Sequence, residues 1–146
     1  MTNLESQISD ARREVSADTI SMSVSELTSL YKEGILVIRP EFQRLFRWTS
    51  EQKSRLVESI ILGIPIPSIF VSQDENGRWE LVDGLQRVST LLQLQGLLVG
   101  SNNTPLPALA LEATEYLPDL DGKVWGEPDG LSEAQMLDIK IGRAHV

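Results

Sequence analysis

The sequence contains no cysteine, which excludes a disulfide framework and catalysis by a thiolate. His145 is the only histidine, so neither a histidine-based metal site nor a Ser-His-Asp triad of the usual kind can be assembled. No apolar run approaches the ~18 residues of a membrane span, and the N-terminus lacks the features of a secretory signal. We therefore expect a cytoplasmic protein that does not act at a membrane.

The charge balance is acidic overall and uneven along the chain. The formal net charge of -8 opposes binding to a phosphate backbone. Residues 35–60 nevertheless carry five basic and three acidic side chains, whereas residues 101–138 carry eight acidic side chains against the single Lys123. This pattern is compatible with a basic face on an acidic molecule, but two solvated surfaces of opposite sign are the commoner meaning of such a pattern.

Two capping boxes mark the starts of helices. Ser23-Val24-Ser25-Glu26 predicts a short helix that ends near Gly34, and Thr49-Ser50-Glu51-Gln52 predicts a second helix that ends near Gly63. We expect the segment between them to be a strand at residues 35–38 followed by a loop at 41–48.

The rest of the chain alternates between extended and helical patterns. Residues 68–72 and 79–83 flank a turn signal at 74–77 and predict a hairpin, and the apolar stripe after Asp83 predicts a helix that ends near Gly96. Further on, we expect a strand at Ala108 to Leu111 and a helix from about Ser132 to Asp138.

The segment from Asp83 to Arg87 is the clearest candidate site. A helix start presents unpaired amide groups and the positive end of the helix dipole, which suits phosphate. Gly84 permits close approach of a ligand, Arg87 supplies a fork of donors for phosphate oxygens, and Gln86 can orient a water or contact a base. Asp83 can hold a divalent metal or accept a proton from water. The alternative is a capping box formed by Asp83 and Gln86, with Arg87 as a surface cation.

A second cluster comprises Gln43, Arg44, Arg47 and Trp48. Its functional interpretation is a basic loop with an aromatic platform that contacts phosphates and stacks on a base. In the structural interpretation, the aromatic side chains anchor the loop in the core and the arginines are solvated.

Three segments in order, 40–48, 56–67 and 82–91, resemble the domain-of-unknown-function family numbered 262, the ParB-like N-terminal domain of GmrSD-type modification-dependent restriction proteins. Residues 117–125 also look like a continuation of that family. The resemblance therefore covers roughly residues 24 to 138. We expect a polar, weakly patterned leader (1–22), a ParB-like nucleotide-binding domain (23–138) that is incomplete at its C-terminal end, and a tail (139–146).

The resemblance implies an α/β fold, a small mixed sheet with packed helices, and hydrolysis of a nucleoside triphosphate with Mg²⁺. It identifies Asp83, Gln86 and Arg87 as catalytic candidates, with no metal ligand assigned beyond a possible role for Asp83. The nucleotide-binding candidates that it implies are Gly84, Arg87, Gln43, Arg44 and Trp48. The family motif reads Asp-Gly-Gln-Gln-Arg, and this chain has Leu85 at the first glutamine; a core-facing leucine there is harmless, whereas loss of a polar contact puts turnover in doubt.

The implied partners are the nucleotide and, through the intact parent protein, DNA and an HNH-type nuclease domain. Residues 141–146 read like the in-frame translation of a common sequencing adapter, so we expect residues 139–146 to be a non-native tail and the native protein to continue. Two other functions stay open: a non-catalytic module that binds DNA or senses its modification, and an inactive fragment.

Overall fold

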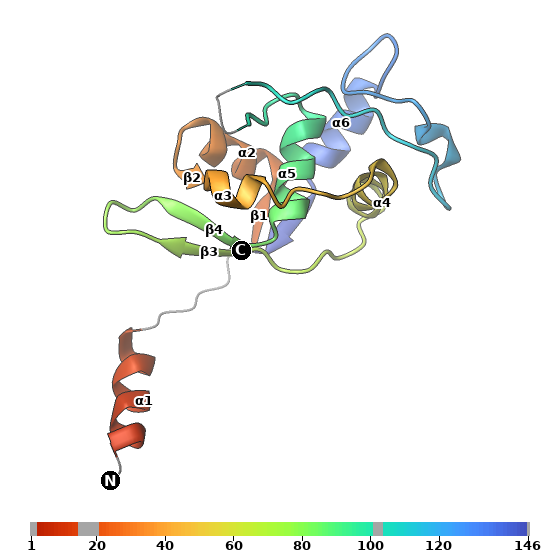
Figure 1. The fold of residues 1–146 in the computed structure, drawn as a ribbon. Helices are drawn as coiled ribbons and strands as arrows, with labels where there is room; N and C mark the ends of the chain where they lie inside the picture. Colours follow the sequence, from red (N-terminus) through yellow and green to blue (C-terminus); the bar gives the residue numbers. More distant parts are fainter. Residues whose placement is uncertain (1–2, 15–20, 101–103, 146) are drawn as a thin grey trace.

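A computed structural model describes residues 3–14, 21–100 and 104–145 (Figure 1). The described residues form an α/β fold, as expected. In Figure 1, α1 is drawn apart from the other elements, and α5 lies between the three-stranded sheet on one side and α4 and α6 on the other. The elements in chain order are α1 (Asn3–Glu14), β1 (Ser21–Ser23), α2 (Val24–Lys32), β2 (Leu36–Val37), α3 (Pro40–Gln43), α4 (Ser50–Ile61), β3 (Phe70–Gln73), β4 (Trp79–Asp83), α5 (Leu85–Leu94), the 3-10 helix η1 (Pro118–Leu120), α6 (Glu133–Lys140) and β5 (Arg143–His145).

Capping boxes start three of the helices. Ser23 and Thr49 cap α2 and α4 and exchange hydrogen bonds with the third residue of each helix, which confirms both predicted starts. Ser132 caps α6 in the same way. These reciprocal bonds satisfy amide groups that a helix start otherwise leaves without partners.

The main sheet is small and mixed, with strand order β2-β4-β3. Strand β2 pairs with β4 in parallel, and β3 pairs with β4 as the predicted antiparallel hairpin. Asp74 fixes the hairpin turn, because its Oδ1 accepts hydrogen bonds from the backbone of Asn76 and Arg78. A second, two-stranded sheet pairs β1 with β5.

Helix α5 lies between two hydrophobic clusters and contributes side chains to both. Leu91 and Leu94 belong to the cluster that includes α4 and α6, whereas Val88 and Leu92 belong to the cluster beneath the main sheet. All four side chains are almost completely buried. Packing on both sides fixes the orientation of α5, and therefore the position at which it begins.

Two predictions about local structure are wrong. Residues 108–111 do not form a strand: Leu111 alone makes backbone bonds, to Lys123 and Gly122, and two prolines at 105 and 107 limit any longer ladder. The segment 41–48 is not wholly a loop, because Pro40 starts the one-turn helix α3.

The last described residues are part of the fold. Ile139 and Ala144 are buried, and the backbone oxygen of Gly142 accepts a 2.8 Å hydrogen bond from the amide of Val24. The non-native origin of residues 139–146 stays a prediction. None of the helices in the described ranges combines the length and apolar character needed to cross a bilayer.

Candidate functional site

The junction between β4 and α5 leaves several amide groups without a partner. Gly84 precedes the helix with a φ of 99°, and no side chain caps the start. The first helical bond runs from Val88 to the Gly84 oxygen, so the amides of residues 85–87 donate to no partner in the described part of the chain. These three N–H groups and the helix dipole together place partial positive charge at the N-terminus of α5.

Glycine is required at position 84 for two reasons. Its positive φ is a conformation that side chains with a Cβ rarely adopt. A Cβ at this position would also lie 3.0 Å from Cγ1 of Ile69, a side chain that is fully buried. The backbone of the junction is thus held against the core, and Gly84 is buried.

Asp83 does not form the capping box that the sequence allowed. Its exposed carboxylate accepts a 2.9 Å hydrogen bond from the amide of Gly84, through Oδ1, and leaves the helix start uncapped. The capping-box interpretation of Asp83 and Gln86 is therefore wrong. The carboxylate is exposed beside Gly84, and its second oxygen has no hydrogen-bond partner among the described residues.

The side chain of Arg87 folds back toward the junction. Its Nη2 donates a 3.0 Å hydrogen bond to the backbone oxygen of Ser68 and lies 3.4 Å from where a Cβ on Gly84 would be. Its Nε is buried and has no partner among the described residues. The guanidinium therefore lies next to Gly84, and its planar set of donors is of the kind that suits an anion with several oxygens.

Gln86 holds the loop that precedes α4. Its Oε1 accepts 3.1 Å hydrogen bonds from the amides of Arg47 and Trp48, and its Nε2 donates to the oxygen of Leu45. Both lone-pair positions of the amide oxygen are thereby used, and one N–H remains. The role that this geometry assigns to Gln86 is to position the loop; the sequence had suggested contact with water or a base.

A groove of about 330 Å³ lies beside Arg87. Trp48 forms part of its wall, helix α4 contributes Gln52 and Arg55, and residues 65–67 also line it. The groove therefore combines an aromatic ring, two guanidinium groups and an amide. Sequence reasoning did not place Gln52 or Arg55 here, although their spacing of three residues puts them on one face of the predicted helix.

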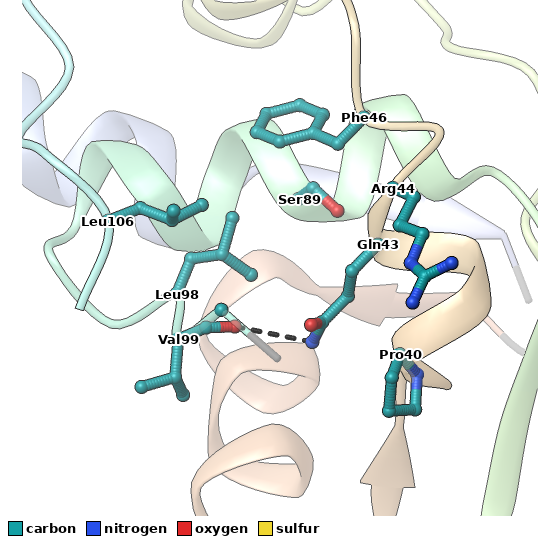
Figure 2. Close-up of a pocket in the computed structure, with 9 residues that line it drawn as sticks. Pro40, Gln43, Arg44, Phe46, Ser89, Leu98, Val99 and Leu106 are labelled. Atoms are coloured by element: carbon teal, nitrogen blue, oxygen red, sulfur yellow. Dashed lines mark hydrogen bonds between the residues drawn. The ribbon is translucent and has the colours of Figure 1, made fainter. Parts of the chain in front are cut away.

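A second, separate pocket lies on the other side of the 44–48 loop. Gln43 and Arg44 line it together with Phe46 (Figure 2), and neither Trp48 nor Arg87 belongs to it. The nucleotide-binding candidates from the sequence thus fall into two groups: Gln43 and Arg44 in this pocket, and Gly84, Arg87 and Trp48 around the start of α5.

Lys53 joins α4 to α5 beneath the loop. Its Nζ donates a 2.7 Å hydrogen bond to Oε1 of Gln93 and lies 4.3 Å from the centre of the Phe46 ring. Burial of the ammonium group lowers the pKa of Lys53 below its ordinary value. Lys53 thus contacts the side chain of Phe46 in the 44–48 loop, whereas Gln86 binds the backbone of the same loop.

Leu85, which replaces the first glutamine of the family motif, is half-buried and packs against the cluster beneath the main sheet. It faces the core rather than the groove beside Arg87. The leucine is therefore compatible with a working site at the helix start.

The fold and this junction define an α/β domain in which the turn from β4 into α5 carries no side-chain cap. The chain belongs to the family of the N-terminal domain of the GmrSD restriction endonuclease, whose model matches residues 24–129. The match includes the start of α5, the 44–48 loop and both pockets. Searches of curated proteins and of solved structures found no match.

Proposed function

We propose that this restriction-type domain binds a nucleoside triphosphate at the start of α5 and hydrolyses it. The observation that carries the proposal is the combination of free amides at residues 85–87 with an Arg87 guanidinium that lies next to Gly84. Backbone amides at a helix start bind phosphate oxygens, and a planar arginine fork adds charge-assisted bonds.

Each candidate residue has a separate role in this proposal. The glycine at position 84 allows the phosphates to approach the backbone, and Arg87 binds them. Asp83 accepts the proton of the attacking water, because its carboxylate is exposed at the entrance. Trp48 offers a stacking surface in the groove, and Arg55 a second cation.

The residues fit a Mg²⁺ ion that arrives with the phosphates. Among the described residues no group of three or more His, Cys, Asp or Glu side chains could hold a metal. Mg²⁺ in nucleotide sites is held by one or two carboxylates together with substrate phosphates and waters. Asp83 is the carboxylate placed to contribute, and the ion would neutralise phosphate charge there.

In the intact parent protein, we propose that nucleotide turnover licenses cleavage of DNA by an associated HNH-type nuclease domain. The family to which the chain belongs supports a restriction or phage-defence role. The acidic chain itself offers limited attraction for DNA, which favours delegation of DNA cleavage to another part of the protein.

The binding step is tested by titrating four nucleoside triphosphates into the wild-type chain, Arg87→Ala and Arg78→Ala. Arg78 is an exposed arginine in the hairpin turn and serves as the matched control. Loss of a charge-assisted contact, ~1.5 to 3 kcal/mol, predicts affinity about 10-fold to 100-fold weaker for Arg87→Ala alone. Equal affinity in all three proteins would reject the site.

The hydrolytic step is tested with Asp83→Asn and Asp74→Asn. Asp74 is the hairpin-turn carboxylate and lies outside the proposed site. We expect Asp83→Asn to lose phosphate release, since the amide cannot accept the proton. Phosphate release at the wild-type rate would remove Asp83 from the mechanism.

A second candidate function is binding of DNA by the 44–48 loop. Arg44 and Arg47 are exposed, and no ion pair to either is found within the described ranges. This candidate predicts DNA affinity that falls with salt, that weakens in an Arg44→Ala/Arg47→Ala double variant and that persists in Arg87→Ala. DNA affinity that is insensitive to salt and to both loop substitutions would reject it.

A further inference from the structure

Helix α1 carries a stripe of exposed apolar side chains. Leu4 and Ile8 are 64% and 40% exposed, and Ala11 is exposed as well. Their spacing of four and then three residues places them on one face of the helix, as at the a and d positions of a coiled coil. In the sequence the same spacing continues to residues 1 and 15, which lie outside the described residues.

A helix of this length needs a packing partner in water. Isolated helices shorter than ~12 to 15 residues are marginal even when they are rich in alanine. Helix α1 has 12 residues, and four of them are serine, asparagine or aspartate, which are weaker helix formers. Figure 1 shows α1 apart from the rest of the fold, and the family match, which begins at residue 24, does not include it. The apolar stripe is therefore the surface on which a partner would stabilise α1.

The charges beside the stripe are complementary to those of a second α1 helix. Glu5 and Arg12 lie two turns apart on the same side of the stripe, and both border a shallow hollow with Ile8. In an antiparallel pair with two-fold symmetry, Glu5 of each copy lies opposite the partner's Arg12, so this contact forms twice. The same alignment sets Ile8 against the small partner's Ala11. A parallel pair would set Arg12 opposite Gln7 and leave Glu5 without a cation.

We propose that the stripe is covered by a second copy of this chain, through antiparallel pairing of the two α1 helices. Each helix is about 18 Å long, so the pair buries less than the ~1,200 Å² of a stable interface. The dimer should therefore be weak, with a dissociation constant between about 10 µM and 1 mM. None of the residues assigned to the triphosphate site takes part in this contact.

Sedimentation equilibrium of the full chain, at concentrations up to about 1 mM, measures the dimer. Glu5→Arg and Arg12→Glu each set like charges opposite one another twice, so each should weaken dimerisation about ten-fold. The double variant Glu5→Arg/Arg12→Glu exchanges the two charges and should restore the wild-type affinity. Because the double variant keeps the arginine near the helix start, this rescue separates the contact between copies from any effect on the helix dipole.

Asp10→Arg is the matched control for Glu5→Arg. It makes the same change from carboxylate to guanidinium and the same change in net charge. Asp10 projects about 130° from the centre of the stripe, so its substitution should leave the dimer unchanged. Leu4→Ser/Ile8→Ser removes the stripe and should abolish the dimer without changing the melting temperature of the remaining fold.

The direction of the pair is tested with a paramagnetic label on Ser6→Cys, which is specific because the chain has no cysteine. Residue 6 lies on the face opposite the stripe, so the label does not disturb the contact. Labelled chain is mixed with ¹⁵N-labelled wild type. Antiparallel pairing predicts broadening of amide signals at the C-terminal end of α1, whereas parallel pairing predicts it at the N-terminal end.

Three results would overturn the proposal. The first is a wild-type chain that remains monomeric at about 1 mM. The second is a dimer of equal affinity in Glu5→Arg, Arg12→Glu and Asp10→Arg, which would place the interface elsewhere on the molecule. The third is broadening at the N-terminal end of α1, which would reject the antiparallel arrangement.

Discussion

Replacing Gln86 by alanine tests whether this side chain holds the 44–48 loop. The substitution removes three hydrogen bonds to backbone groups of that loop. Each is worth ~0.5 to 1.5 kcal/mol net, and the exposed Arg47 amide can find water, so we expect a loss of about 2 to 3 kcal/mol. For a chain of this size the melting temperature should fall by about 5 to 10 °C.

Urea unfolding followed by tryptophan fluorescence measures the free energy of unfolding, with Gln73→Ala as the control. Gln73 is exposed on β3, and its substitution should change stability by less than ~0.5 kcal/mol. Amide hydrogen exchange then locates the effect: protection of the Arg47 and Trp48 amides should fall, and that of α4 should not. Unchanged protection at both amides, or stability equal to the control, would refute the loop-holding role.

Three further outcomes follow from the same region. Gly84→Ala should cost about 2 kcal/mol in thermal or urea unfolding, because φ is positive and the new Cβ meets Ile69; a neutral effect would contradict the described backbone. Leu85→Gln restores the family motif and should lower stability by about 1 kcal/mol without raising nucleotide affinity in calorimetry; tighter binding would show that residue 85 faces the ligand. Burial lowers the pKa of Lys53, so the folded state releases its proton before the unfolded state does, and the stability of the wild type relative to Lys53→Met should rise as pH passes upward through that window. A difference that is independent of pH up to about 10 would contradict it.

Local signals allowed most of the helix starts and the hairpin to be predicted. Ser23 and Thr49 act on amides three residues away, so their capping boxes are complete in the sequence itself. The same locality misled at residues 108–111, where an apolar pattern predicts a strand but only Leu111 finds backbone partners. A segment becomes a strand only if another strand pairs with it, and the sequence of the segment alone does not show whether such a partner is present.

The role of Gln86 could not be predicted from its surroundings in the chain. Its partners lie 38 to 41 residues earlier, and their backbone groups face it only because α5 is packed between two clusters. The motif from Asp83 to Arg87 correctly located the junction between β4 and α5. The sequence did not show that the nucleotide-binding candidates would border two different pockets, because this depends on where the 44–48 loop crosses α5. Such crossings are set by tertiary packing.

The 44–48 loop separates the two pockets described above. Phe46 borders one of them and Trp48, two residues later, borders the other, on a backbone tied to α5 through a single glutamine. A ligand that displaces this loop from one pocket also changes the volume of the other pocket. The coupling free energy must be the same in both directions, so a ligand in either pocket would change the affinity of the other pocket for its ligand by the same factor.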